Sequence, residues 1–121
     1  SPVIRNFKPD AIIVACGFDA GPFDPLAHMM VSAKGFADMT ARVMALADEV
    51  CGGKLVLVHE GGYAEAYVPF CGHAVMAQLA GSAISAGDPL GEMIAARQPN
   101  ARVQAFHRGY VDDYAAYFGL A

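Results

Sequence analysis

The 121 residues suffice for one domain at most, and their composition is unusually apolar. Hydrophobic residues make up 55% and 13 more residues are glycine, whereas charged residues make up 17%, against about 25% in an ordinary soluble domain. The net charge of −4, with 8 scattered Lys and Arg, offers no basic patch for nucleic acid, and no apolar run reaches the length of about 18–20 residues that crosses a membrane. We therefore expect residues 1–121 to form a single segment whose apolar faces are covered by more protein, as in an oligomer or a larger domain.

The cysteines indicate the compartment. Cys16, Cys51 and Cys71 form no CxxC pair and no regular ladder of spacings. An odd count disfavours a disulfide scaffold, and the first ten residues lack the apolar core of a signal peptide. We expect a reducing, cytoplasmic location.

The first half of the chain predicts a strand, a loop and a helix. Residues 11–16 are continuously apolar and partly β-branched, which is typical of a parallel strand buried on both faces. Residues 17–26, GFDAGPFDPL, contain two Gly, two Pro and two Asp and therefore predict a loop. A helix is expected over about residues 33–50 and should end at Gly52-Gly53, because apolar residues recur at helical spacing: Phe36, Met39, Val43, Leu46 and Val50.

The second half begins with a predicted buried strand over Lys54–Val58. Residues 68–80 predict a helix with Pro69 in its first turn. Only His73 and Gln78 interrupt its apolar sequence, so we expect this helix to be buried on more than one side.

One short helix and a last helix complete the predicted order. Asp88 is expected to cap one that ends near Gln98, and Asn100 to cap another that ends near Phe118. The resulting order of strand, helix, strand and further helices is that of an α/β fold. Two strands alone do not make a stable sheet, so the fold is expected to be incomplete as a stand-alone unit.

Both predicted strands run into unusual loops at their carboxyl ends, where open α/β sheets bind ligands. If the strands are neighbours, Asp19 and the EGGY sequence of residues 60–63 face one another across one site. Asp19 can bind a metal or accept hydrogen bonds from nearby backbone N–H groups. The Tyr63 phenol can donate to a developing oxyanion or be a buried aromatic with a satisfied hydroxyl. Asp24, before a proline, is expected in a turn or a cap.

The four histidines show no close metal-ligand spacing. A catalytic zinc takes several protein ligands, and Asp19 is the one credible ligand in this chain, so a metal site would be incomplete here. We expect His28 at the rim of the site and His59 in the packing beside it. His73 is expected to be a hydrogen-bonded core residue, and His107 to lie on a helix far from the loops.

Four stretches occur in a familiar order: PDAIIVACGFDAGPFDPL, KGFADMT, GGKLVLVHEGGY and AYVPFCGHAV. Through them, the stretch from Pro9 to Gly81 resembles the C-terminal part of the zinc-dependent histone deacetylase and acetylpolyamine amidohydrolase family, most of all its bacterial class II-type members. The GFDA, DPL and EGGY motifs, in order after buried strands, make the resemblance specific. It implies an arginase-like α/β sandwich with a mostly parallel sheet, of which residues 1–121 would be a C-terminal portion.

The resemblance also implies residue roles. Asp19 would be a Zn²⁺ ligand, and Tyr63 would polarise the acyl carbonyl and stabilise the tetrahedral intermediate. Leu26 would line the acyl-lysine channel, and Gly61 and Gly62 would form the wall beside the tyrosine. The family's other Asp and His ligands and its His-His pair have no counterpart in this chain.

The implied function is part of a zinc-dependent deacylase that hydrolyses the amide of acetyl-lysine or an acetylpolyamine. The isolated chain is expected to be inactive, because the remaining groups would come from a missing N-terminal part or another protein chain. One alternative is a non-enzymatic, truncated deacetylase-like module that associates with itself or a partner subunit. Another is a different α/β hydrolytic or binding domain that shares the strand and loop pattern and has no zinc-dependent activity.

Overall fold

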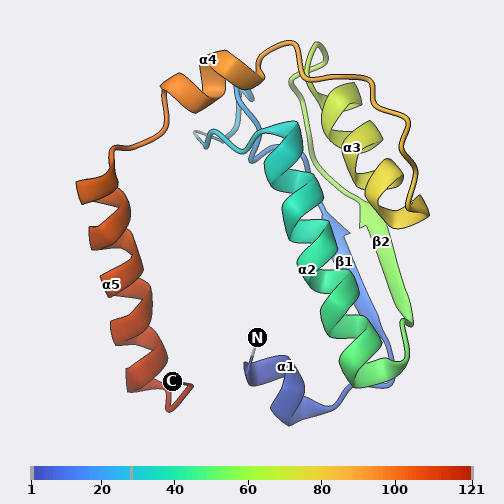
Figure 1. The fold of residues 1–121 in the computed structure, drawn as a ribbon, viewed down its shortest axis with the longest axis vertical. Helices are drawn as coiled ribbons and strands as arrows, with labels where there is room; N and C mark the ends of the chain where they lie inside the picture. The colour runs from blue at the N-terminus through green and yellow to red at the C-terminus, as the bar shows by residue number, and fades with distance from the viewer. Residues whose placement is uncertain (1, 28, 121) are drawn as a thin grey trace.

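The computed structural model describes residues 2–27 and 29–120, so His28, expected at the rim of the site, lies outside the described residues. The helices and strands follow the predicted α/β order, with one additional helix at the start (Figure 1). In chain order they are α1 (Pro2–Phe7), β1 (Ile12–Cys16), α2 (Ala33–Cys51), β2 (Leu55–His59), α3 (Val68–Ala80), α4 (Gly91–Ala96) and α5 (Ala101–Tyr117).

The two strands are parallel neighbours, as predicted. Their register pairs Ile12 with Leu55 and Cys16 with His59, and α2 forms the crossover between them. Backbone pairing continues beyond the strand ends, where the Glu60 N–H donates to the Cys16 carbonyl at 3.2 Å. The two loops that follow the strands therefore start side by side.

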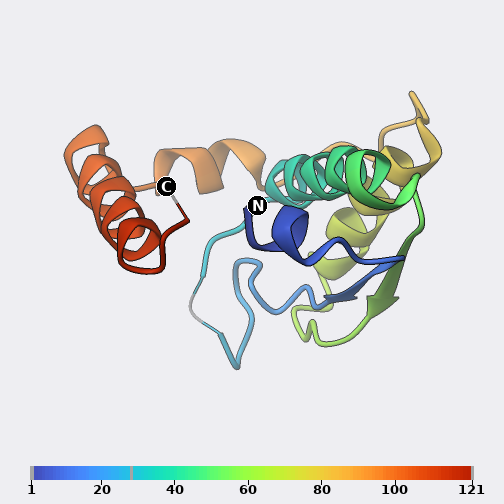
Figure 2. The same cartoon turned by 90° about the horizontal axis from the view of Figure 1, so that it is seen from below.

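The sheet is covered on one face. Both α2 and α3 lie on the same side of the strands (Figure 2), and Cys16 and Leu57 pack toward them. The opposite face carries Ile13, Val56 and Val58, and Ile13 is 73% exposed. The prediction of strands buried on both faces is therefore wrong for the described residues. Alternate side chains of a strand point to opposite faces, and both helices of this segment pack on the same one.

Helix α3 is likewise buried along one stripe. Cys71 and Val75 are buried, whereas Met76 and Leu79 are exposed. The expectation that α3 is buried on more than one side is wrong for this segment, because its contacts are made on the face that packs against α2.

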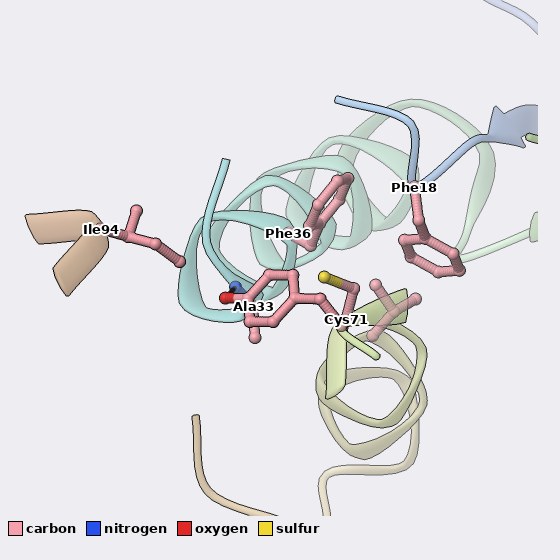
Figure 3. Close-up of a cluster of buried hydrophobic side chains, with 7 residues drawn as sticks. Phe18, Ala33, Phe36, Cys71 and Ile94 are labelled. Carbon is pink, nitrogen blue, oxygen red and sulfur yellow. Dashed lines mark hydrogen bonds between the residues drawn. The ribbon is translucent and has the colours of Figure 1, made fainter. Parts of the chain in front are cut away.

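The core joins the first loop to three helices. Phe18, Phe36 and Cys71 point toward one another in Figure 3, and the rings of the two phenylalanines meet edge to face with centroids 5.2 Å apart. Edge-to-face geometry is a preferred arrangement of aromatic pairs. The full buried cluster is Phe18, Ala33, Phe36, Tyr67, Cys71, Val75 and Ile94.

Three of the helix boundaries test the predicted caps. Gly52 ends α2 with a φ of 64°, and Asn100 begins α5 by accepting hydrogen bonds from two backbone N–H groups, so both predictions are confirmed. The prediction that Asp88 caps α4 is wrong. The cap position is Leu90, and Asp88 lies two residues earlier, where its Oδ1 accepts from the Leu90 N–H at 3.0 Å.

Helix α1 has no counterpart among the predicted elements. Its Arg5 forms two hydrogen bonds with Glu49 of α2, from Nε to Oε1 at 2.7 Å and from Nη2 to Oε2 at 2.8 Å. Both side chains are half-exposed. The ion pair joins residues 44 positions apart, which no local pattern indicates.

Helix α5 stands away from the sheet and α2 in both Figure 1 and Figure 2, and none of its residues is buried. Aromatic side chains repeat every four residues on it at Phe106, Tyr110 and Tyr114, and Phe118 follows just after its end. Successive ring centroids are 6.4, 5.0 and 6.5 Å apart. These rings form an exposed aromatic ladder.

In the described part of the chain, no helix combines the length and hydropathy needed to span a bilayer.

Candidate functional site

Phe18 fixes the start of the first site loop. Its side chain is buried in the core, and its N–H donates to the Gly61 carbonyl at 2.8 Å. The residue that follows it, Asp19, is therefore held beside the second loop. Sequence analysis did not single out Phe18, although a large apolar residue inside a loop rich in Gly, Pro and Asp indicates burial.

The Asp19 carboxylate lies between two glycines. A Cβ added at Gly17 would lie 2.9 Å from Oδ1 of Asp19, and one added at Gly61 would lie 2.8 Å from Oδ2. Both distances are shorter than real Cβ contacts, so the absence of side chains at these positions makes room for the carboxylate. Asp19 is half-buried, and within residues 2–27 and 29–120 its carboxylate has no hydrogen-bond or ion-pair partner. Neither oxygen is engaged by a group in the described ranges, so both are open to a ligand there.

The side chains of Tyr63 and Asp19 both lie beside Gly61. The same added Cβ at Gly61 would lie 3.4 Å from Cε2 of Tyr63, so the carboxylate and the phenol ring flank one glycine. Tyr63 is 53% exposed in this segment, so its phenol is open to a ligand here. The structure thus brings the two principal predicted site residues together at the carboxyl ends of neighbouring strands.

Gly62 allows the chain to pass over Phe18. Its φ is 134°, a conformation that residues with a side chain rarely adopt. A Cβ there would lie 2.9 Å from Cβ of Phe18 and 3.2 Å from Cγ2 of Val68. The two predicted wall glycines therefore have different local reasons: Gly61 makes room for a carboxylate, and Gly62 permits a backbone turn.

Asp24 forms the predicted turn and also reaches the second loop. Its Oδ1 accepts hydrogen bonds from the N–H groups of Leu26 at 2.9 Å and Ala27 at 3.3 Å, and its Oδ2 accepts from the N–H of Tyr63 at 2.8 Å. The residue is only 5% exposed. Burial raises the pKa of the Asp24 carboxyl, but the backbone N–H donors outweigh burial and hold the pKa below its ordinary value.

The Asp24 turn presents Leu26 on the outside of the loop, where its side chain is 71% exposed. Phe23, just before the turn, has a φ of 64°, in the left-handed region that side chains disfavour. The predicted channel residue therefore lies on the surface of a loop whose backbone is held by Asp24.

The histidines lie around the site without completing it. His59 is exposed and its ring stacks at a tilt on Phe18, 5.2 Å away, which agrees with the expected packing role. His107 lies on the exposed α5, away from the site loops, as expected. Across the described ranges, no three His, Cys, Asp or Glu side chains come together as a metal-binding group.

His73 was expected to be a hydrogen-bonded core residue, and this expectation is wrong. It is half-buried, lines an open groove of about 460 Å³ between β2 and α3, and has no hydrogen-bond partner among the described residues. The groove stays open because the described elements cover α3 on one side.

A second tyrosine, Tyr67, is turned inward at the start of α3. It is 1% exposed, its hydroxyl donates to Oδ2 of Asp88 at 2.8 Å, and the Tyr67 hydroxyl oxygen accepts from the Ala33 N–H at 2.9 Å. Burial and the Asp88 carboxylate raise the pKa of Tyr67 well above its ordinary value. These bonds tie the start of α2 to the loop before α4, a link that sequence analysis missed.

Comparisons with known proteins show the class to which this fold and these loops belong. A family model of the histone deacetylase domain matches residues 1–79. The chain belongs to the histone deacetylase domain family.

The chain is similar to several named relatives. A histone deacetylase-like amidohydrolase of Pseudomonas aeruginosa is 49% identical over 119 residues, which cover 98% of this chain and 31% of that protein. A probable deacetylase of Archaeoglobus fulgidus is 38% identical over 70% of this chain and 24% of its own length. Human histone deacetylase 7 is 35% identical over 98% of this chain and 12% of its own length.

Two solved structures share the fold. The crystal structure of the HDA15 HD domain matches 70% of this chain and 23% of its own length, with a TM-score of 0.58 and 34% identity. The structure of the histone deacetylase Clr3 matches 77% of this chain and 16% of its own length, with a TM-score of 0.58 and 28% identity. The chain therefore has the α/β fold of one part of a deacetylase domain, and it spans less than a third of the length of the relatives it matches.

Proposed function

We propose that this segment supplies one side of the active site of a zinc-dependent deacylase that hydrolyses the amide of acetyl-lysine or an acetylpolyamine. The observation that carries the proposal is the placement of Asp19 and Tyr63 on the two flanks of Gly61, at the carboxyl ends of neighbouring parallel strands. Membership of the deacetylase family supports the same reaction class.

The residues present fit one part of a zinc site. Aspartate oxygen is a usual zinc ligand, and the Asp19 carboxylate is open and held beside two glycines that leave it room. When bound, Zn²⁺ would polarise the acyl carbonyl and a water molecule. A catalytic zinc needs further protein ligands, which in this proposal come from the rest of the deacetylase domain or from another chain.

Tyr63 supplies the hydrogen bond in this proposal. Its exposed phenol would donate to the acyl oxygen, and the bond would strengthen as negative charge develops on that oxygen. Leu26 would contact the aliphatic part of the acylated amine, and Gly61 would let the acyl group approach the backbone beside Tyr63. A base that takes the proton of the attacking water would come from outside this segment.

The bare face of the sheet supports the need for further protein. Ile13, Val56 and Val58 expose apolar surface on a parallel sheet, and such sheets occur almost only with both faces covered. We infer that this face packs against the remainder of the deacetylase domain, and that the isolated chain oligomerises and has no deacylase activity.

Two variants in the protein that carries this segment with the rest of the domain test the proposal. Tyr63→Phe removes one oxyanion donor and keeps the ring, so kcat on an acetyl-lysine peptide should fall by about 10²–10³. Asp19→Ala should lose bound zinc and activity together. Zinc content by mass spectrometry, kcat, KM and melting temperature are measured on each preparation.

Asp38→Ala is the matched control, because Asp38 lies on the exposed surface of α2 and, among residues 2–27 and 29–120, pairs only with Lys34 four residues away. It should keep zinc and turnover. Near-normal turnover by Tyr63→Phe, or full zinc in active Asp19→Ala, contradicts the proposed roles. A full-length protein without zinc-dependent activity would favour the non-enzymatic module.

A further inference from the structure

We propose that Asp24 is a positioning residue that holds the backbone of Tyr63 in register with the loop that presents Leu26. This inference rests on the proposed function. It assigns a task to a carboxylate that touches neither substrate nor zinc in that proposal.

The first step is the full use of the Asp24 carboxylate. Oδ1 accepts from Leu26 and Ala27 on its own loop, and Oδ2 accepts from the N–H of Tyr63, which is 39 residues away in the chain. One buried side chain therefore binds the backbones of both site loops.

The second step is that few other contacts hold Tyr63 in the described part of the chain. Its carbonyl accepts from the Glu65 N–H at 3.1 Å, which is a contact within its own loop. Its side chain is exposed, so packing alone does not fix it, and it follows Gly62, a glycine with a φ of 134°. The preceding contact between the two loops is the bond from Phe18 N–H to the Gly61 carbonyl. The charge-assisted bond from the Tyr63 N–H to Asp24 is stronger than a neutral one, and it fixes the backbone position from which the phenol side chain extends.

The third step is the requirement for a carboxylate rather than an amide. An Asn at position 24 can keep one oxygen toward Leu26 and preserve the turn. Its NH₂ group would then face the Tyr63 N–H, donor against donor. Asp24→Asn therefore removes the link to Tyr63 while the local turn survives.

The chain contains a matched control for this substitution. Asp88 begins a second DPL sequence, its Oδ1 accepts from Leu90, and its Oδ2 accepts from the hydroxyl of Tyr67. The Tyr67 hydroxyl already accepts from the Ala33 N–H and has a second lone pair, so it can accept a hydrogen bond from the amide of an Asn at position 88, at the cost of the acceptor for its own O–H. Asp88→Asn carries the same chemical change in the same tripeptide and keeps its contact.

The experiment measures kcat and KM on an acetyl-lysine peptide in the full-length protein. Asp24→Asn should lower kcat by up to about 100-fold, the scale expected when a reacting group is misplaced by about 1 Å. Asp88→Asn should change kcat by less than about twofold, as a change remote from the reacting groups does. In a Tyr63→Phe background, Asp24→Asn should lower kcat no further, because a positioning residue acts through the hydroxyl that is already gone.

Unchanged kcat in Asp24→Asn, or an equal fall in the presence and absence of the Tyr63 hydroxyl, would overturn the assignment. Amide hydrogen exchange of Tyr63 gives a readout independent of activity. The amide should be protected in the wild type and in Asp88→Asn and unprotected in Asp24→Asn, whether or not the protein is a deacylase. Failure of the proposed function appears separately, as an inactive wild type or an unaffected Tyr63→Phe.

Discussion

The two DPL sequences, residues 24–26 and 88–90, form the same turn and lead to different structures. In each, Oδ1 of the aspartate accepts from the leucine N–H two residues later, at 2.9 Å in the first and 3.0 Å in the second. In each, Oδ2 reaches a tyrosine near the start of α3. The first aspartate holds the backbone of the exposed Tyr63, and the second holds the hydroxyl of the buried Tyr67.

The difference shows that the DPL motif determines the turn but does not determine which group the second carboxylate oxygen binds. A carboxylate bound to a tyrosine backbone leaves the phenol free for chemistry, whereas a carboxylate bound to the hydroxyl consumes it. The exposed fractions of 53% and 1% for the two tyrosines follow the same division. The first turn belongs to the proposed site, and the second belongs to the framework that joins α2, α3 and α4.

The largest effect on stability is expected at Gly62, the residue that precedes Tyr63 at the first turn. Gly62→Ala combines a strained φ of 134° with a Cβ 2.9 Å from Phe18, and should lower the free energy of unfolding by about 2–5 kcal/mol. Gly81→Ala is the control, because Gly81 has a φ of 60° but no atom within 4 Å, and should cost about 1 kcal/mol. Urea denaturation measures both, and equal losses would contradict the close contact with Phe18.

A smaller effect is expected at the second turn. Tyr67→Phe leaves the Asp88 carboxylate and the Ala33 N–H without the hydroxyl, and should lower the free energy of unfolding by about 1–3 kcal/mol while kcat stays near normal. Tyr63→Phe should show the reverse pattern. A fall in kcat for Tyr67→Phe without loss of stability would contradict the assignment of a structural role to Tyr67.

The smallest effect is the acid dependence of the first turn. The pKa of Asp24 is lowered in the folded protein, so its stabilisation is present above its ordinary pKa of 3.8 and is lost as pH falls through the folded value. Melting temperature should therefore decline less steeply with falling pH in Asp24→Asn than in the wild type. Parallel curves would show that the turn carries no charge-dependent stability.

The strands, α2 and the capped start of α5 were predictable because their signals are local. A continuous apolar run, a helical repeat and an Asn before a helix act within a few residues. Helix α1 was not predicted, and its ion pair with α2 joins Arg5 to Glu49 across 44 residues, which no local pattern indicates. The exposed face of the sheet was mispredicted because the apolar strand sequences indicate a sheet covered on both faces in the whole domain. In this segment, helices cover one face.

The approach of Asp19 to Tyr63 was predictable from the position of each residue after a strand, once the strands were taken as neighbours. The contact of Asp24 with Tyr63 was not, because a DP dipeptide predicts a turn wherever it occurs. Asp88 makes the same point, since it was expected as a helix cap and instead binds a tyrosine 21 residues earlier. In both turns, the group that binds Oδ2 of the aspartate is set by the tertiary structure and not by the local sequence.

The aromatic ladder of α5 determines what optical spectroscopy of this chain reports. The chain has no tryptophan and five tyrosines, of which Tyr110, Tyr114 and Tyr117 lie on α5. Its intrinsic ultraviolet emission therefore comes mainly from the helix that is farthest from the sheet, and a change in that emission follows the surroundings of α5. A single tryptophan introduced at Phe36, in edge contact with Phe18, would give a separate signal for the core.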